Sequence, residues 1–217
     1  MKQFLTKWKI KKHRARLEKY GADATELFTL AQLYRQLAQD EQARESYQEA
    51  IEAYYQAGTR VGQDNEFIVM VCWALLALDP VNELAYRTLG QEFCGSCEFE
   101  QAVELYTHFA QKLVEAMRFD DAIAQYRNAL VLRPENLELH QGLLTVLWRL
   151  HRKEEVVQEL KTIAGLAEKA HDHGKAIECY RNALKIRPAD ILLKTELARL
   201  VQRVRTMEKP LRLVVNE

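Results

Sequence analysis

Apolar runs, glycine and proline are all scarce in this sequence of 217 residues. No run of eighteen apolar residues is present, so the sequence predicts no membrane-spanning helix. Eight Gly and four Pro leave little material for long irregular loops. The N-terminal segment lacks the apolar block and the small-residue cleavage site of a secretion signal. These absences argue against the membrane-embedded, secreted and loop-rich classes of protein.

Cysteine is scarce as well, and its four positions, 72, 94, 97 and 179, are scattered. Such a distribution does not predict a disulfide framework. A hydrophobic content of 48% and a charged content of 29% are typical of an ordered, soluble chain. We therefore expect a reduced, cytoplasmic protein.

Motifs of catalysis are missing too. The sequence has no recognisable Gly-rich phosphate loop, Ser/His/Asp arrangement or paired carboxylates. Cys94-Gly-Ser-Cys97 can in principle hold half a zinc site or exchange thiols, which makes a metal- or thiol-dependent protein one alternative. No second pair accompanies it, so we interpret both cysteines as structural. His171-Asp-His173 is interpreted as a solvated turn. The sequence therefore predicts no enzyme, no metal and no cofactor.

Against these absences stands a repeat. Pro80, Pro134 and Pro188 follow one another at a spacing of 54 residues, and similar sequence surrounds each. Two residues after each proline comes a side chain suited to open a helix, namely Asn82, Asn136 or Asp190. A fixed period of this size indicates stacked supersecondary units rather than one closed globule.

Apolar residues recur at helical spacing from residue 24 to about 206, which predicts three helices in each copy. Asp23 and Glu26 resemble a capping box at the start of the first one. The expected helices cover residues 24–38, 40–57 and 65–78; 82–96, 98–117 and 120–132; and 136–151, 153–172 and 175–186. The connection around Gly58–Gly62 is about five residues longer than its equivalents in the other copies.

The expected organisation has three parts. A basic helix covers residues 1–20, and a solenoid covers 21–206, with units 24–80, 81–134 and 135–188 and a capping helix at 189–206. A tail, residues 207–217, follows Lys209-Pro210 and contains the β-prone segment 211–215, a docking strand if the chain is a domain of a larger machine. The predicted fold is an all-α, right-handed α-solenoid of about eleven helices.

The spacing resembles the tetratricopeptide repeat (TPR), a helix pair of 34 residues with small and aromatic residues at set positions. Residues 24–57 are similar to it through Leu30-Ala31, Tyr34, Ala43, Tyr47 and Ala50. Residues 83–116, 103–136 and 157–190 resemble it as well, and two of these windows overlap. One helix therefore serves as the second helix of one repeat and the first of the next.

The resemblance implies a non-enzymatic scaffold or adaptor, which binds a segment of a partner protein along a concave groove formed by first helices and supports assembly of a complex. The candidate groove residues are Phe28, Gln32, Arg35, Gln36, Arg87, Thr88, Gln91, Gln141, Thr145, Trp148 and Arg149. Phe28 and Trp148 are the candidate anchors, because aromatic side chains contribute strongly to interfaces. The alternative is that each packs against a neighbouring helix.

Residues 1–20 carry eight Lys/Arg and one Glu, a net charge of +7 in a chain whose total is zero. The basic arm comprises Lys7, Lys9, Lys11, Lys12, Arg14 and Arg16. Together with Phe4, Leu5 and Trp8, this composition is typical of a helix lying on an anionic membrane, which makes a peripheral-membrane adaptor a second alternative. A solvated helix whose three apolar side chains pack on the first repeat is the simpler interpretation. Nothing else in the chain supports nucleic-acid binding.

Overall fold

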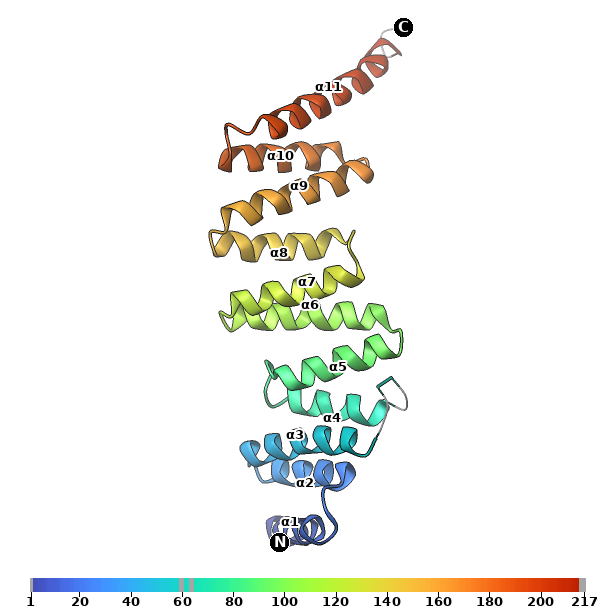
Figure 1. Cartoon of the computed structure of the whole chain (residues 1–217), viewed down its shortest axis with the longest axis vertical. Coiled ribbons are helices and arrows are strands. Elements are labelled where there is room, and N and C mark those ends of the chain that lie inside the picture. Colours follow the sequence, from blue (N-terminus) through green and yellow to red (C-terminus); the bar gives the residue numbers. More distant parts are fainter. Residues whose placement is uncertain (1, 59–60, 63–64, 215–217) are drawn as a thin grey trace. The chain divides into compact units, whose positions relative to one another are not determined.

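The computed structural model describes residues 2–58, 61–62 and 65–214. These residues contain eleven α-helices and no β-strand (Figure 1). The helices are α1 (Lys2–Tyr20), α2 (Ala24–Gln36), α3 (Asp40–Gln56), α4 (Glu66–Leu76), α5 (Glu83–Gly95), α6 (Phe99–Glu115), α7 (Phe119–Leu132), α8 (Leu137–Arg149), α9 (Lys153–Lys169), α10 (His173–Ile186) and α11 (Ile191–Val214). The predicted all-α, solenoid-type fold is confirmed, and the helices of the three copies begin and end close to their predicted bounds.

The chain forms two compact units, Met1–Ala116 and Met117–Glu217. Within each unit a helix packs mainly on its neighbours in sequence. This packing also joins consecutive copies, because α4 packs on α5 and α7 packs on α8 across the proline positions. The proline-delimited copies are therefore repeats of sequence and local conformation, and packing is continuous from one to the next.

The predicted helix-opening residues act as N-caps. The side chain of Asn82 accepts a hydrogen bond from the Ala85 N–H at 3.1 Å. Asn136 accepts from Glu138 and Leu139 at 2.9 and 3.2 Å, and Asp190 accepts from the Leu193 N–H at 3.1 Å. Each bond satisfies a backbone donor that the first turn of a helix leaves unpaired. The 54-residue period is thus a period of helix starts.

The turns between helices repeat as well, 54 residues apart between the second and third copies and 59 residues apart between the first and second, because the first copy has the longer connection. A residue with positive φ follows the first helix of each copy, at Ala38, Cys97 and His151, and another follows the second helix, at Gly58, Met117 and His171. At Ala38 the backbone closes a Schellman motif, in which the Gln39 N–H donates to the Tyr34 carbonyl at 3.0 Å. The same Schellman motif follows α5, α8 and α9.

The C-terminal segment differs from expectation. The helix expected to end before Lys209-Pro210 continues as α11 to Val214, so the β-prone segment is helical over 211–214, and residue 215 lies outside the described residues. A strand requires a neighbouring strand for its hydrogen bonds, and the described residues contain none. Leu and Arg, which dominate residues 211–213, are good helix formers.

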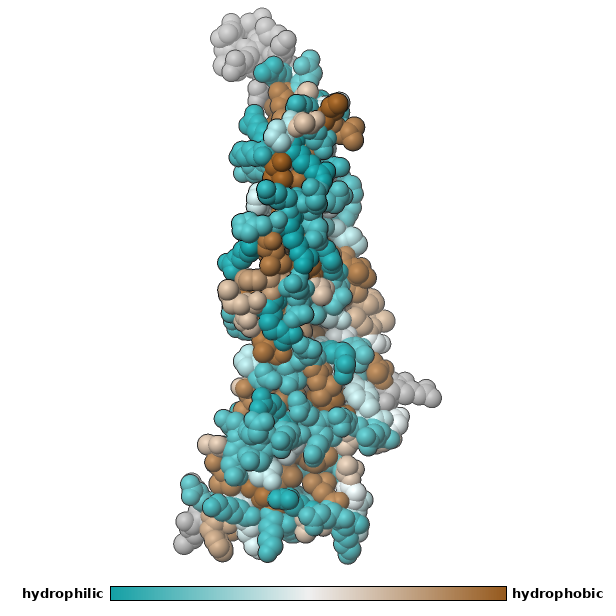
Figure 2. All heavy atoms as spheres, turned by 60° about the vertical axis from the view of Figure 1, so that its left-hand side comes forward, coloured by the Kyte–Doolittle hydropathy of each residue, from teal (hydrophilic) through white to brown (hydrophobic). Residues whose placement is uncertain are grey.

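No helix among the described residues combines the length and the apolarity needed to cross a bilayer. Figure 2 shows hydrophilic side chains over most of the face that it presents, with hydrophobic side chains in separate patches between them.

Candidate functional site

Alternate helices share a layer in each unit. In the first unit, Phe28 of α2 meets Phe67 of α4 with ring centroids 5.8 Å apart, and the Tyr55 hydroxyl of α3 donates to Glu92 of α5 at 2.5 Å. In the second unit, α9 forms ion pairs with both α7 and α11, through Arg127–Glu155 and Arg199–Glu168. Consecutive helices thus alternate between two layers, as in other helical solenoids.

This alternation separates residues that the sequence grouped together. Each copy has three helices, which is an odd number. The first helices of consecutive copies, α2 and α5, therefore lie in opposite layers of the first unit. The candidate residues on α2 therefore do not share a surface with Arg87, Thr88 and Gln91 on α5. First helices share one face where every repeat is a pair of helices. Because each copy here has a third helix, the first helices of consecutive copies lie on opposite faces instead.

The candidate residues differ in their surroundings. Gln32, Arg35 and Gln36 are exposed, whereas Phe28 packs against Tyr47 and Phe67, which is the alternative that the sequence left open for it. On α5, Arg87 and Gln91 are exposed, and Thr88 is buried and cannot meet a partner. On α8, Gln141, Thr145, Trp148 and Arg149 are all exposed, with 43% of Trp148 accessible.

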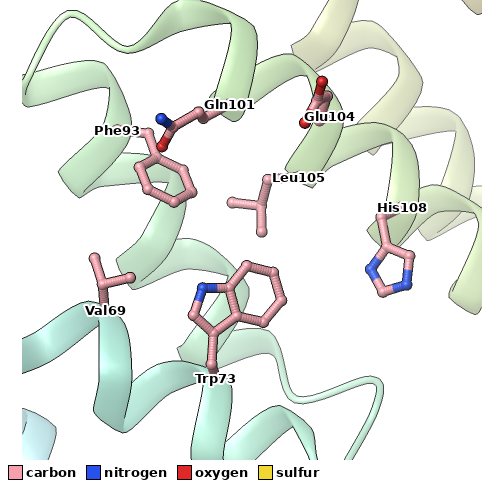
Figure 3. A pocket seen from close by; sticks show the side chains of 7 residues that line it. All are labelled: Val69, Trp73, Phe93, Gln101, Glu104, Leu105 and His108. Carbon is pink, nitrogen blue, oxygen red and sulfur yellow. The ribbon is translucent and has the colours of Figure 1, made fainter. Parts of the chain in front are cut away.

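A hollow lies between α4 and α6 in the first unit, and none of the predicted groove residues lines it. Its volume is about 530 Å³. Trp73 and Val69 line it from α4, Phe93 from α5 and Leu105 from α6, and the polar side chains of Gln101, Glu104 and His108 complete it. Figure 3 shows the Trp73 indole extending into this space toward Leu105, with Phe93 beside Val69. We call this feature the α4–α6 groove.

Contacts with Tyr86 of α5 hold the α6 side of the groove in place. The Tyr86 hydroxyl and His108 Nδ1 lie 3.0 Å apart, and the Tyr86 ring stacks on Phe109 with centroids 3.8 Å apart. Burial raises the pKa of Tyr86 to about 12, so its hydroxyl stays protonated at neutral pH. These contacts support the groove within the chain itself.

The sequence contains a signal for this groove. Trp73 occupies the position at which the other two copies have Arg127 and Arg181, each 54 residues further on. Met70 likewise stands where they have Ala124 and Glu178, and both Met70 and Trp73 are exposed. These exposed apolar side chains distinguish the surface of α4 from the matching surfaces of α7 and α10, although only Trp73 of the two lines the groove.

The long α3–α4 connection is attached to α5 through one buried carboxylate. Glu92 is fully buried and accepts from the Tyr55 hydroxyl and, at 2.7 Å, from the Gly62 N–H. Asn65 donates to Ser96 at 3.0 Å nearby. Gly62 has a φ of 78°, and a Cβ there would come within 2.6 Å of the Gly95 backbone, so glycine is required at this close approach. These contacts place α4, and with it Trp73, beside α5.

The Cys94–Cys97 motif does not form a metal centre with other ligands. All four cysteines are free thiols, and Cys97 lies exposed in the α5–α6 turn with a φ of 61°. Cys94 contacts Tyr106, whose pKa is raised first by burial and then by this neighbour. No group of three or more His, Cys, Asp or Glu that could hold a metal occurs in the part of the chain that the structure describes.

The basic helix α1 packs on α2 through a face different from the expected one. Ile10 and Leu17 contact the cluster that contains Leu30 and Leu33. Phe4, Leu5 and Trp8, expected in that contact, are exposed instead. The reason is helical spacing, because residues 10, 13 and 17 lie on one side of a helix and residues 4 and 8 lie on the other.

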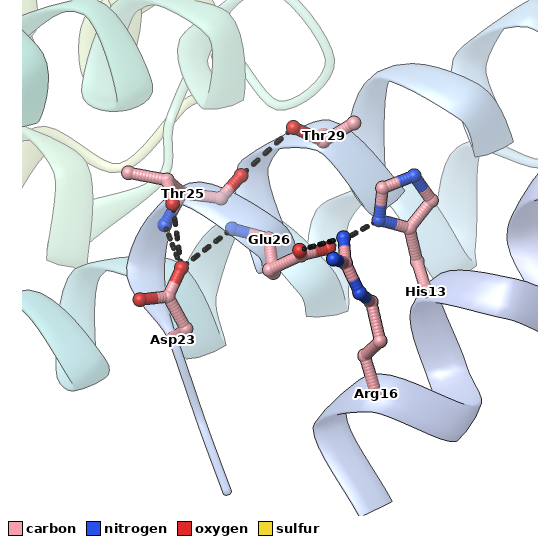
Figure 4. Close-up of polar contacts among 6 residues, drawn as sticks. All are labelled: His13, Arg16, Asp23, Thr25, Glu26 and Thr29. Atoms are coloured by element: carbon pink, nitrogen blue, oxygen red, sulfur yellow. Dashed lines mark hydrogen bonds and ion pairs between the residues drawn. The ribbon is translucent and has the colours of Figure 1, made fainter. Parts of the chain in front are cut away.

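Glu26 joins α1 to α2. Its carboxylate pairs with His13 and accepts from Arg16 at 2.7 Å (Figure 4). Asp23 caps α2 by accepting from the Thr25 and Glu26 N–H groups at 3.1 and 2.9 Å. The expected capping box is therefore half present, because the Glu26 side chain turns to His13 and Arg16 of α1 instead of back to the cap.

Comparison with known proteins identifies the repeat. The tetratricopeptide repeat model matches residues 27–56 and 162–190, so these two segments are TPR motifs, as the sequence resemblance predicted. The first match covers α2 and α3, the first and second helices of their copy. The second covers the end of α9 and α10, the second and third helices of theirs. The middle helix thus closes a repeat in one copy and opens it in another.

Solved structures with similar folds share little sequence with this chain. A crystal structure of MamA is 15% identical and covers 75% of this chain and 89% of that one, with a TM-score of 0.38. PilF of Pseudomonas aeruginosa is 13% identical, with 90% and 92% covered and a TM-score of 0.35. YrrB, described as a TPR protein with an unusual peptide-binding site, is 16% identical, with 85% and 96% covered and a TM-score of 0.33. No curated protein sequence matches the chain.

Proposed function

We propose that this chain is a non-enzymatic scaffold that binds a segment of a partner protein in the α4–α6 groove. The observation that carries the proposal is Trp73, an indole 44% exposed at the edge of a preformed apolar hollow. A volume of about 530 Å³ falls in the range of specific binding pockets and accommodates one large apolar side chain with its neighbours. Stacked helices present this surface already ordered, so binding costs little conformational entropy.

The chemistry of the groove defines the partner segment. Val69, Phe93 and Leu105 form an apolar lining that suits an aromatic or branched aliphatic anchor. Glu104 lines the groove from α6, and α4 contains no Lys or Arg. A segment that carries an apolar anchor followed by a basic residue, in a helix or an extended strand, is complementary to this surface.

Substitution of two tryptophans tests whether a partner binds in the α4–α6 groove or on the surface that the sequence predicted. Peptides selected from a phage-displayed library on the full chain are titrated by calorimetry against the wild type, Trp73→Ala and Trp148→Ala. We expect Trp73→Ala to weaken binding by about 2 kcal/mol, as hot-spot aromatics do, and Trp148→Ala to change it by less than about 0.5 kcal/mol. Circular dichroism confirms that both variants keep their helices.

The reverse pattern would move the site to α8, where Trp148 was predicted to be the anchor. Equal affinity for all three proteins would overturn both sites.

A cytoplasmic location remains a prediction, supported by the four free thiols.

A further inference from the structure

The contact between α1 and α2 determines which side of α1 faces outward. Ile10 and Leu17 are held against α2, and His13 and Arg16 are paired with Glu26. Trp8 precedes Ile10 by two residues, a rotation of about 200° around the helix axis, so it projects on the opposite side. Phe4 lies one turn before Trp8 on that same side. The first unit therefore presents a defined outer face of α1.

This outer face combines aromatic and basic side chains. Phe4 is 77% exposed and Trp8 is 55% exposed, and Leu5 is exposed beside them. Among the side chains of the helix that the structure describes, the exposed cations are Lys7, Lys9, Lys11, Lys12, Arg14 and Lys19, besides Arg16, which is held by Glu26. The Lys12 ammonium lies 5.6 Å from the centre of the Trp8 ring. Glu18 is the single acidic side chain of the helix.

We propose that the outer face of α1 binds an anionic membrane surface, with the helix lying flat in the headgroup region. Phe4, Leu5 and Trp8 would enter the boundary between headgroups and acyl chains, where aromatic rings are favoured. Lysine stems reach around such a helix and place their ammonium groups among lipid phosphates. This role is separate from peptide binding in the α4–α6 groove, and neither depends on the other.

The positive charge of α1 indicates an anionic partner. Its exposed apolar side chains favour a membrane over other anionic partners. A net charge of +7 over residues 1–20 attracts any polyanion. Unpaired bases of nucleic acid can stack on the rings of Phe4 and Trp8, but nucleic acid offers no apolar layer for the aliphatic side chain of Leu5. A bilayer supplies both the anionic surface and the apolar layer beneath it.

The test uses the full chain, because deleting residues 1–20 would expose Leu30 and Leu33 of α2. Binding is measured by co-sedimentation with vesicles of phosphatidylcholine and phosphatidylglycerol in equal parts, and with phosphatidylcholine alone. We expect binding to the mixed vesicles only. The double variant Phe4→Ser, Trp8→Ser should lose at least about tenfold in affinity, and Lys11→Gln, Lys12→Gln a similar amount.

A matched control replaces two exposed lysines elsewhere, Lys161→Gln and Lys194→Gln, and should bind the mixed vesicles like the wild type. In a variant with Trp73→Phe and Trp148→Phe, Trp8 is the remaining tryptophan, and its fluorescence should shift to the blue on the mixed vesicles. Unchanged binding by the Phe4, Trp8 variant would overturn the proposal. Tighter binding to a single-stranded RNA oligonucleotide than to the vesicles would overturn it in favour of nucleic acid.

Discussion

Glu92 is a buried carboxylate whose donors come from outside its own helix. The Tyr55 hydroxyl of α3 and the Gly62 N–H of the α3–α4 connection both donate to it. Burial, together with the carboxylate, raises the pKa of Tyr55 and raises that of Cys72 to about 12. Both groups are therefore neutral at pH 7, and the carboxylate is held by hydrogen bonds from neutral donors.

Removal of one of these donors tests how much the cluster stabilises the first unit. We expect Tyr55→Phe to lower the free energy of unfolding by about 1–3 kcal/mol, because a buried carboxylate oxygen loses its partner. Urea denaturation followed by circular dichroism measures the change. Tyr20→Phe, at an exposed position on α1, should stay within about 0.5 kcal/mol of the wild type. Equal effects of the two substitutions would show that the hydroxyl bond contributes nothing.

At the scale of elements, glycines inside helices set how closely neighbouring helices approach. A Cβ at Gly142 of α8 would come within 2.6 Å of the Tyr126 ring on α7. A Cβ at Gly165 of α9 would meet nothing within 4 Å. A substitution at Gly165 therefore measures only the higher helix propensity of alanine. A substitution at Gly142 measures that gain together with the cost of the clash.

We expect Gly165→Ala to raise the free energy of unfolding by about 0.5–1 kcal/mol, because alanine is the better helix former. Gly142→Ala should lower it by about 1–2 kcal/mol, since the clash with a buried ring exceeds that gain. Thermal and urea denaturation of both variants give the comparison. Stabilisation by Gly142→Ala would mean that α7 and α8 can separate without loss.

The turns between helices carry strain at residues other than glycine. Ala38 adopts a φ of 54° at the end of α2, whereas Ala57 at the end of α3 has an ordinary φ of −69°. Both are exposed. Ala38→Gly should stabilise the protein by about 0.5–1 kcal/mol, because glycine adopts the left-handed conformation without a steric cost.

Ala57→Gly provides the matched control for Ala38→Gly. It should destabilise by about 0.5–1 kcal/mol, because glycine adds conformational freedom to the unfolded chain with nothing gained in the fold. Shifts in the midpoint of urea unfolding measure both substitutions. If the two move the midpoint in the same direction, the positive φ of Ala38 is not a source of strain.

At the scale of the whole molecule, buried phenols connect stability to alkaline pH. Burial raises the pKa of Tyr86 and Tyr180 to about 12, and it also raises those of Tyr106 and Tyr126. A pKa that is higher in the folded state than in the unfolded state favours the protonated form on folding. This stabilisation is complete below the unfolded value of 10.0 and is lost as the pH rises toward 12.

We therefore expect the free energy of unfolding to fall between about pH 10 and pH 12, by up to about 1.4 kcal/mol per pH unit for each buried tyrosine that ionises. Partly solvated phenols contribute less than this. Urea denaturation at several pH values measures the fall. Tyr86→Phe should make the fall shallower, and an unchanged slope in that variant would rule out Tyr86 as a contributor.

Local features could be predicted from the sequence by itself. Asn82, Asn136 and Asp190 cap helices because a short polar side chain can reach N–H groups only two or three residues away. The 54-residue period of helix starts follows from the same short-range chemistry. So does the match of residues 27–56 and 162–190 to the tetratricopeptide repeat, whose pattern consists of residues on adjacent helices.

Only the tertiary structure decided which surfaces these helices present. Because each copy has an odd number of helices, α2 and α5 lie in opposite layers, and Phe28 and Arg87 do not share a face. Ile10, rather than Trp8, meets α2, and Trp73 comes to line the α4–α6 groove with Leu105. Capping and helical periodicity act between residues close in the chain, whereas layers and grooves depend on packing between helices, and similar amphipathic patterns are compatible with more than one packing.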